Sequence, residues 1–353
     1  NSKITNRMRD RDARGCLNIT QKMCQNGIDP DAYTISSSLK ASVMLGDLEI
    51  GRLIHALFIM SVTEASTYVN STLINMYAKL GNLEDARYVF EKVSDARDIV
   101  SWNAMITGYT KHGFAEDAVN LYKLLNYSCM QPTDITFTMA LHGCACLESL
   151  ECGRQIHKDI LIRSTNSNIY VNNILIDMYT KCGSLEDALK VFDDMPEHDV
   201  VSWNAMIAAF SKNGLPEKAF LFFVQMLNEG MHANDRTLVN ILNACKAVEY
   251  LEQCHRLHTL VEESELRTNV IVCSTMMDMY MKCGEVNRAQ VLFKSIPKLD
   301  VVTWNVIIAA NAKKGNFQEA LELHERMKLQ GIMPNEVTFL GILHACGGLA
   351  ALE

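Results

Sequence analysis

Apolar residues recur at helical spacing along the whole chain, and residues 200–234 show the pattern clearly. The first half of this stretch has apolar residues at the spacing i, i+3, i+4 and i+7: Trp203, Met206, Ile207 and Phe210. After a polar turn the same spacing returns in the second half: Ala219, Phe222, Phe223 and Met226. The stretch is therefore predicted to form two amphipathic helices. They should end near Gly214 and Gly230, because glycine suits the left-handed backbone of a helix end.

Three sequence motifs recur with a period of about 101 residues, and each defines one kind of block. Trp blocks contain SWNAMI or TWNVII, with Trp102, Trp203 and Trp304. His blocks contain GRLIH, GRQIH or CHRLH, ending in His55, His157 and His258. Tyr blocks contain MYAKLGNLEDA, MYTKCGSLEDA or MYMKCGEVNRA, with Tyr77, Tyr179 and Tyr280. The three kinds alternate, so the chain is an array of repeats.

Aligning the motifs predicts lengths of 35 residues for Trp and His blocks and 31 for Tyr blocks, with one extra residue in the first Tyr block. The Trp blocks are 1–31 (partial), 99–133, 200–234 and 301–335. The His blocks are 32–66, 134–168, 235–269 and 336–353 (partial). The Tyr blocks are 67–98, 169–199 and 270–300. Both ends of the sequence fall inside a block, so we expect the natural chain to be longer.

Each block is predicted to form a hairpin of two helices. Two helices of about a dozen residues cannot bury their apolar faces alone, so neighbouring hairpins must stack on one another. The expected fold is all-α, a solenoid of stacked helix-turn-helix hairpins forming one array over residues 1–353.

Composition and charge narrow the possible functions. With 48% apolar and 21% charged residues, the chain can form a continuous core, which excludes wholesale disorder. No apolar run is long enough to span a membrane, and the first residues contain no signal-peptide core. A net charge of −8 excludes a general basic surface as the main way of binding nucleic acid, so such binding would need a local basic track. Twelve cysteines without a secretory signal are expected to be reduced intracellular thiols.

The block lengths, together with VSWNAMI, GRQIH and MYTKCGSLEDA, resemble those of a PLS-class pentatricopeptide repeat (PPR) protein of plant organelles. In that class the Trp, His and Tyr blocks correspond to P, L and S repeats, and the resemblance covers the whole chain. The competing family is the peptide-binding tetratricopeptide repeat, but its uniform 34-residue period and W-x2-L-G-x2-Y signature are absent. The resemblance implies a right-handed superhelical α-solenoid that binds single-stranded RNA at about one base per repeat.

The resemblance assigns base reading to the fifth residue of a block, on its first helix, together with the last residue of the same block. Polar groups at these places can pair with the Watson–Crick edge of an unstacked base. The pairs in the P and S repeats are Asn1 with Asp31, Ser71 with Asp98, Asn103 with Thr133, Asn173 with Asp199, Asn204 with Asn234, Ser274 with Asp300, and Asn305 with Asn335. The L-repeat pairs, expected to read bases poorly, are Ser36 with Ser66, Thr138 with Asn168, and Val239 with Asn269.

The family's code pairs Asn and Asp with U, Asn and Asn with C, and Ser and Asp with G. Applied along the chain from 5′ to 3′, it implies a target resembling U-N-G-Y-N-U-C-N-G-C. Thr133 departs from the usual Asp or Asn, which leaves the identity of its base open.

The residue at the second place of a block packs against the faces of the bases in this family. Here these residues are Tyr68, Val100, Tyr170, Val201, Ile271 and Val302. Stacking tolerates every base and contributes roughly 1 to 3 kcal/mol per base where the side chain is aromatic. The alternative is that these residues form ordinary core between repeats.

A basic residue stands at the thirteenth place of every Trp and Tyr block that reaches this place. These residues are Arg9, Lys79, Lys111, Lys181, Lys212, Lys282 and Lys313, whereas the His blocks have Met44, Cys146 and Ala247. Stacked hairpins would align the basic residues into one cationic track suited to the phosphates of RNA. The alternative is simple capping of a helix C-terminus, which also favours a cation.

No catalytic or metal-binding constellation is evident. Cys144, Cys245 and Cys346 share one place in the His blocks, and Cys182 and Cys283 share one in the Tyr blocks, which is typical of small core residues. The three repeated histidines are interpreted as packing or hydrogen-bonding partners between repeats. There is no C-x2-C pair and no second ligand pair, so no zinc site or other cofactor is expected. The H-x-E and P-C-x-x-C motifs of a cytidine deaminase are also missing.

The leading hypothesis is sequence-specific binding of single-stranded RNA that selects sites for organellar RNA processing, most of all C-to-U editing. The family implies a mitochondrion or chloroplast. The chain as given is not expected to be an enzyme, and a DYW-type deaminase would lie downstream or come from a partner, as would other editing proteins. No membrane contact is expected. The alternative hypothesis is a helical scaffold for protein–protein interaction in a larger assembly.

Overall fold

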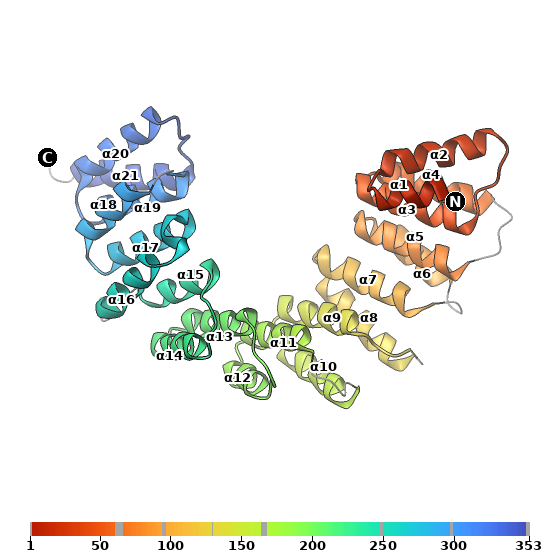
Figure 1. The fold of residues 1–353 in the computed structure, drawn as a ribbon, viewed down its shortest axis with the longest axis horizontal. Helices are drawn as coiled ribbons and strands as arrows, with labels where there is room; N and C mark the ends of the chain where they lie inside the picture. Colours follow the sequence, from red (N-terminus) through yellow and green to blue (C-terminus); the bar gives the residue numbers. More distant parts are fainter. Residues whose placement is uncertain are drawn as a thin grey trace. The chain divides into compact units, whose positions relative to one another are not determined.

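The computed structural model describes residues 2–60, 66–93, 97–128, 130–163, 168–246, 250–296 and 299–350. These residues form 21 α-helices and one short 3₁₀ helix, with no strand among them (Figure 1). The predicted all-α fold is confirmed. No helix in this part of the chain is long and apolar enough to cross a membrane.

The chain divides into two compact units, Asn1–Met195 and Pro196–Glu353. In unit 1 the first helices of the hairpins are α1 (Ser2–Arg9), α3 (Ala32–Leu45), α5 (Thr67–Lys79), α7 (Ile99–Lys111), α9 (Asp134–Cys146) and α11 (Ile169–Lys181). Their second helices are α2 (Ala13–Gln25), α4 (Leu48–Met60), α6 (Leu83–Lys92), α8 (Ala115–Tyr127), α10 (Leu150–Arg163) and α12 (Leu185–Asp193).

Unit 2 is built in the same way. Its first helices are α13 (Val200–Lys212), α15 (Asp235–Ala244), α17 (Val270–Lys282), α19 (Val301–Lys313) and α21 (Glu336–Ala350). Its second helices are α14 (Pro216–Asn228), α16 (Leu251–Glu262), α18 (Val286–Ser295) and α20 (Phe317–Leu329), and the 3₁₀ helix η3 (Glu265–Thr268) follows α16.

Within each unit the hairpins stack in two layers. Each first helix contacts the next first helix, from α1 to α11 in unit 1 and from α13 to α21 in unit 2. In unit 1 every second helix from α2 to α10 packs against the first helix of its own hairpin and the first helix of the next one. The helices α14, α18 and α20 do the same in unit 2, and α16 packs against α17. Each apolar face is therefore buried by two neighbours, as expected for a solenoid.

The repeated tryptophan joins one block to the next. Trp102 on α7 meets Phe90 on α6 edge to face, with ring centroids 4.9 Å apart. Trp304 on α19 meets Phe293 on α18 in the same way, at 4.8 Å. Edge-to-face pairs of aromatic rings are favourable beyond the area that they bury. In these two blocks the tryptophan therefore packs against the second helix of the preceding Tyr block.

The repeated histidine and tyrosine also form a joint between blocks. The imidazole Nδ1 lies 2.9 Å from Tyr77 Oη in His55, 2.8 Å from Tyr179 Oη in His157, and 2.9 Å from Tyr280 Oη in His258. Each bond connects the second helix of a His block to the first helix of the following Tyr block. The interpretation of these histidines as partners between repeats is confirmed.

The helix ends and most of the thiols agree with the sequence analysis. Gly214 and Gly230 have φ angles of 68° and 78°, in the left-handed region, directly after α13 and α14. The shared cysteines Cys144, Cys245 and Cys283 are buried, Cys182 is half-buried, and all four are free thiols. The prediction of a core position is wrong for Cys346, which is exposed. It lies on α21, the last helix of the described residues, so no following hairpin covers it.

Burial keeps the joining histidines and tyrosines neutral. It lowers the pKa of His55, His157 and His258 below the usual imidazole value, although neighbouring carboxylates act in the opposite direction. Burial also raises the pKa of Tyr179 to about 12. A protonated histidine would therefore weaken the folded state.

We expect the free energy of unfolding to fall when the pH is lowered from 7.5 to 5.5. The unfolded chain takes up protons on histidine near pH 6.5, whereas the folded chain does so only at lower pH. The contribution of these histidines to stability is thus complete above about pH 6.5 and is lost as the pH falls through their folded pKa values. Urea unfolding followed by circular dichroism at the two pH values measures the loss. His157→Gln should make the loss of stability between pH 7.5 and pH 5.5 smaller, whereas His232→Gln, at an exposed histidine, should leave this loss unchanged. Equal losses in both variants would contradict the assignment of the pH dependence to the buried histidines.

Candidate nucleic-acid interface

The last residue of each block is the N-cap of the first helix of the next block. Its side-chain oxygen accepts the backbone N–H three residues later, at distances such as 2.8 Å for Asp98 and Ser101 and 2.9 Å for Asn234 and Thr237. Asp, Asn, Ser and Thr suit this place because they satisfy an N–H that the helix itself leaves without a partner. Eight last residues make this bond: Asp31, Asp98, Thr133, Asp199, Asn234, Asn269, Asp300 and Asn335. Ser66 makes no side-chain cap bond, and Asn168 accepts the N–H only two residues later.

The fifth residue of a block lies beside that N-cap in four of the seven P- and S-type pairs predicted above. Ser71 Oγ donates to both carboxylate oxygens of Asp98, each at 2.9 Å. The amide Nδ2 of the fifth residue donates to the last residue in three further pairs: Asn103 to Thr133 Oγ1 at 3.1 Å, Asn204 to Asn234 Oδ1 at 3.2 Å, and Asn305 to Asn335 Oδ1 at 2.9 Å. Residues about 30 positions apart in sequence thus form one polar pair at the start of each following helix.

The remaining three pairs differ. Ser274 Oγ donates to the backbone carbonyls of Val270 and Ile271, at 2.7 and 3.1 Å, rather than to Asp300. Asn173 belongs to unit 1 and Asp199 to unit 2, so each is described only within its own unit. Asn1 lies outside the described residues.

The structure does not bring the His-block pairs together by hydrogen bonds among the described residues. Ser36 Oγ is buried without a hydrogen-bond partner, and Thr138 Oγ1 donates to the carbonyl of Ile135. Asn168 Nδ2 donates to Asp134 at 2.6 Å, Ser66 makes no side-chain cap bond, and Asn269 caps the backbone of α17. Val239 is half-buried and carries no polar group.

The apolar residues at the second place are all exposed. The exposed fractions of Tyr68, Val100, Tyr170, Val201, Ile271 and Val302 lie between 51% and 60%. The alternative interpretation, that these residues form core between repeats, is therefore wrong. Tyr33, Ile135 and Val337 at the same place in His blocks are also exposed, whereas the His block 235–269 has Arg236 there.

The seven predicted basic residues are exposed, and each is the last residue of a first helix. Two of them are tied to a carboxylate four residues earlier: Lys181 Nζ lies 2.8 Å from Asp177 and Lys282 Nζ lies 3.0 Å from Asp278. Although burial raises the pKa of Asp278, hydrogen bonds from Lys246 and Lys282 lower it below the usual carboxyl value. The positions fit helix capping as well as contact with an anion.

The sequence analysis missed a set of hydroxyl groups at the third place of the Trp and His blocks. All seven side chains are at most 1% exposed: Thr34, Ser101, Thr136, Ser202, Thr237, Thr303 and Thr338. Six of these hydroxyls bond to the N-cap residue, as in the distance of 2.7 Å from Ser101 Oγ to Asp98 Oδ1. The signal was present in the sequence, because each reading pair is followed by an N-cap-x-x-Ser/Thr pattern typical of a capping box.

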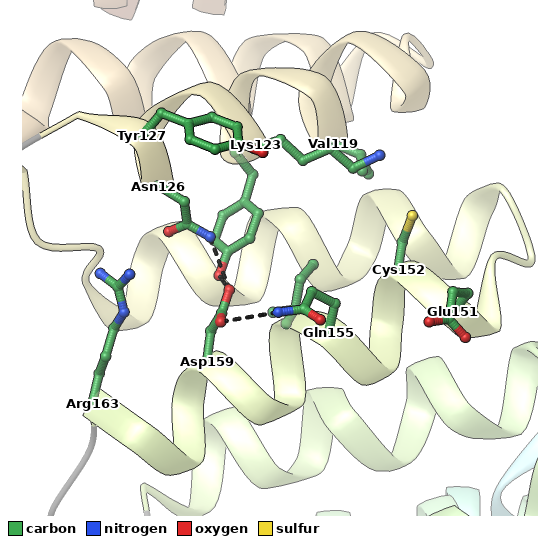
Figure 2. Close-up of a pocket in the computed structure, with 11 residues that line it drawn as sticks. Val119, Lys123, Asn126, Tyr127, Glu151, Cys152, Gln155, Asp159 and Arg163 are labelled. Atoms are coloured by element: carbon green, nitrogen blue, oxygen red, sulfur yellow. Dashed lines mark hydrogen bonds between the residues drawn. The ribbon is translucent and has the colours of Figure 1, made fainter.

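A pocket of about 490 Å³ lies between the second helices α8 and α10 and holds a polar cluster (Figure 2). Asp159 accepts hydrogen bonds from Tyr122 Oη at 2.8 Å, from Asn126 Nδ2 at 2.8 Å and from Gln155 Nε2 at 3.4 Å (Figure 2). None of the predicted RNA-contacting residues lines this pocket. No group of three or more His, Cys, Asp or Glu side chains in the described ranges could hold a metal ion.

Comparison with protein-family models decides the family. Residues 97–146, 198–247 and 299–348 match the model of the PPR repeat family. Residues 71–96, 173–200 and 271–301 match the PPR repeat model, and the six stretches together cover more than half of the chain. The chain belongs to the pentatricopeptide repeat family. Both models describe a repeat and not a catalytic domain.

Curated plant proteins are similar to almost the whole of this PPR chain. Pentatricopeptide repeat-containing protein At1g11290, chloroplastic, from Arabidopsis thaliana is 35% identical over 341 residues, covering 97% of this chain and 42% of the relative. Pentatricopeptide repeat-containing protein At3g09040, mitochondrial, from the same plant is 34% identical over 337 residues, covering 94% of this chain and 33% of the relative. The chain spans about half the length, or less, of the curated relatives it matches.

Solved structures share the fold of this PPR chain. A crystal structure of the pentatricopeptide repeat protein PPR10 in complex with an 18-nt psaJ RNA element has a TM-score of 0.69 and 17% identity, covering 95% of this chain and 55% of PPR10. The crystal structure of PPR10 from maize has a TM-score of 0.62, also at 17% identity. Both therefore show a common arrangement of helical hairpins.

Proposed function

We propose that this PPR chain binds single-stranded RNA in a sequence-specific way, at about one base per block. The fifth and last residues of the Trp and Tyr blocks recognise the base edge, the exposed second-place residues contact the base faces, and the thirteenth-place cations contact phosphates. The His blocks contribute little to base recognition. No step of the proposed function requires catalysis by this segment.

The observation that carries the proposal is the coincidence of three kinds of side chain on the first helices. Polar pairs such as Asn305 and Asn335 stand at one end, next to exposed apolar residues such as Val302. An exposed cation such as Lys313 ends the same helix. Base edges, base faces and phosphates need these three chemistries in a fixed order. A protein-binding scaffold does not require them in one register, which is why RNA is the favoured ligand.

The relatives support a finer proposal. PPR10 binds an RNA element, and the names of the plant relatives place them in chloroplasts or mitochondria. We assign the chain to the PLS class because of its alternating block lengths, and to a mitochondrion or chloroplast. Its proposed role is to select sites for organellar RNA processing, most of all C-to-U editing. A deaminase would act with it from a downstream segment or a partner protein.

The direct test is binding of the purified chain to a labelled RNA that contains UNGYNUCNGC. The comparison RNA has the two G positions changed to C, at the same salt concentration. Preference for the first RNA supports the register and the reading residues together. Equal weak binding to both RNAs would instead favour the protein scaffold.

Asn234→Asp should change the preferred base at the seventh nucleotide of this RNA from C towards U. The substitution replaces an outward amide by a second carboxylate oxygen and keeps the oxygen that caps the helix. We expect a shift in relative affinity worth about 1 to 3 kcal/mol, if the contact resembles good base recognition in DNA. Fluorescence anisotropy with RNAs that differ only at this nucleotide measures it. The same shift at the other nucleotides would contradict the one-base assignment.

Lys212→Ala should weaken binding to all RNAs about equally. If all seven cations neutralise one phosphate each, log K against log salt concentration has a slope no steeper than roughly −5, at about 0.7 per contact. The variant should reduce the magnitude of the slope by about 0.7. Lys218→Ala, on the second helix of the same hairpin, is the matched control and should leave the slope unchanged. A change of base preference in Lys212→Ala would contradict the phosphate role.

A further inference from the structure

A buried hydroxyl follows every predicted pair of the Trp and Tyr blocks and none of the pairs of the His blocks. The third place of the next block is Ser or Thr after all seven of the former pairs. After the three His-block pairs it is valine: Val69, Val171 and Val272. These valines are as buried as the hydroxyl residues, with at most 3% exposed. The core therefore accommodates Ser, Thr or Val at the third place, and Ser and Thr differ from Val by their hydroxyl group.

The hydroxyl of Thr237 takes part in a closed set of hydrogen bonds with the N-cap residue Asn234. The backbone N–H of Asn234 donates to Thr237 Oγ1 at 3.1 Å. Thr237 Oγ1 in turn donates to Asn234 Oδ1 at 3.0 Å, and the Thr237 backbone N–H donates to the same oxygen at 2.9 Å. Asn335 and Thr338 repeat this arrangement with distances of 3.0, 3.1 and 3.1 Å. Because the hydroxyl oxygen already accepts a bond, its hydrogen is directed towards Oδ1.

The hydroxyl and the backbone N–H of Thr237 both donate to one atom of the Asn234 side chain, and this determines the orientation of its amide group. Only the oxygen of Asn234 can accept them, so its Nδ2 must take the outer place, and the reversed orientation would set donor against donor. Asn204 Nδ2 also donates to Asn234 Oδ1, at 3.2 Å. Nδ2 of Asn234 and of Asn335 donates to no group among the described residues. Each pair therefore offers an N–H donor on its outer side.

An aspartate at the same N-cap position presents a hydrogen-bond acceptor on its outer side instead of a donor. Asp300 Oδ1 accepts the Thr303 backbone N–H at 2.8 Å and the Thr303 hydroxyl at 2.6 Å. The outer atom is then Oδ2, which can only accept while the carboxylate is ionised. The pyrimidine edges differ in the same sense, since N3 of cytosine accepts a hydrogen bond and N3–H of uracil donates one.

In two of the three described Trp blocks that reach a following block, its hydroxyl also contacts the fifth residue, whereas Asn204 Oδ1 is buried without a hydrogen-bond partner. Thr136 Oγ1 donates to Asn103 Oδ1 at 2.6 Å, and Thr338 Oγ1 lies 2.5 Å from Asn305 Oδ1. The hydroxyl thus lies beside both members of these pairs, and its single hydrogen is donated to one of their oxygens at a time. In the His blocks, where valine replaces it, Asn168 turns to Asp134 and Asn269 bonds only to backbone N–H groups.

We propose that the third-place hydroxyl of the following block is a positioning residue for base recognition. It holds the last residue of the reading pair in the one orientation that exposes a donor from Asn or an acceptor from Asp. In the His blocks valine takes its place, and the oxygens of Asn168 and Asn269 are held by backbone N–H groups alone. The inference rests on the proposed RNA binding and adds to it a residue that touches no base.

The test compares Thr237→Val with Thr237→Ser in the full chain. The RNAs differ only in C or U at the seventh nucleotide, and Thr20→Val, which removes a buried hydroxyl on α2, is the matched control. We expect Thr237→Val to lower the ratio of affinities for C over U about five- to tenfold, the loss of one oriented hydrogen bond, with Thr237→Ser and Thr20→Val unchanged. Melting curves show that the variants are folded. A purely structural hydroxyl would lower affinity for both RNAs equally.

The outcomes separate the two proposals. If the wild-type chain prefers C and Thr237→Val keeps that preference, the inference is overturned and the proposed function stands. If the wild-type chain has no preference for C at this nucleotide, the proposed function fails and the inference fails with it.

A second experiment introduces a reading pair and a third-place hydroxyl at a His block, which lacks them. It does not require that Thr237→Val folds. Val239→Asn supplies a fifth-place amide beside Asn269, and Val272→Thr supplies the hydroxyl. The double variant should gain a preference for C at the eighth nucleotide that exceeds the effect of Val239→Asn alone about fivefold. Equal behaviour of the single and double variants would overturn the inference.

Discussion

The candidate interface depends on the hydrogen bond from the third backbone N–H of a first helix to the side chain directly before that helix, which eight block ends make. It defines where a block ends, because an oxygen-bearing residue must stand there to satisfy the helix. It also holds that residue beside the fifth residue of the preceding first helix, as Asp98 lies beside Ser71. A local requirement of helix termination thereby places two residues about 30 positions apart within hydrogen-bonding distance.

The core beneath this surface is built from joints that recur with the blocks. Trp102 and Trp304 join a Trp block to the Tyr block before it, and the His–Tyr bonds join a Tyr block to the His block before it. Each joint buries a large aromatic ring, and burial lowers the pKa of His55, His157 and His258. The tryptophans, histidines and tyrosines of the repeated motifs are thus core, whereas other residues of the same motifs, such as Asn204 and Lys181, belong to the candidate interface.

The positive charges of the candidate interface are local, although the chain as a whole is acidic. The chain carries a net charge of −8, yet every first helix of a Trp or Tyr block ends in an exposed cation. Lys181 and Lys282 are balanced by aspartates one turn earlier, whereas no carboxylate of the described residues lies within 4.0 Å of Lys212 or Lys313. Within each unit, local cations of this kind favour a nearby anion without making the whole surface basic.

The sequence by itself determined the helices, their ends, the block boundaries and the family. These depend on helical periodicity, on capping residues and on motif spacing, all of which act over a few residues and are visible without a fold. The apolar faces predicted for residues 200–234 are buried as expected, and Gly214 and Gly230 adopt the predicted backbone.

Only the tertiary structure decided which side chains meet and which face outward. Val201 and Trp203 are both apolar and two residues apart, but one is 58% exposed and the other 2%. Helical spacing separates their faces, and only the position of the neighbouring hairpin shows which face is covered. For the same reason Ser71 lies within hydrogen-bonding distance of Asp98 as well as of its own helix, whereas Ser274 bonds to its own helix. The hydroxyl of Thr237 likewise reaches Asn234 in the preceding block. Hydrogen bonds between blocks depend on how helices approach one another, and that geometry is set by packing across the whole stack rather than by any local pattern.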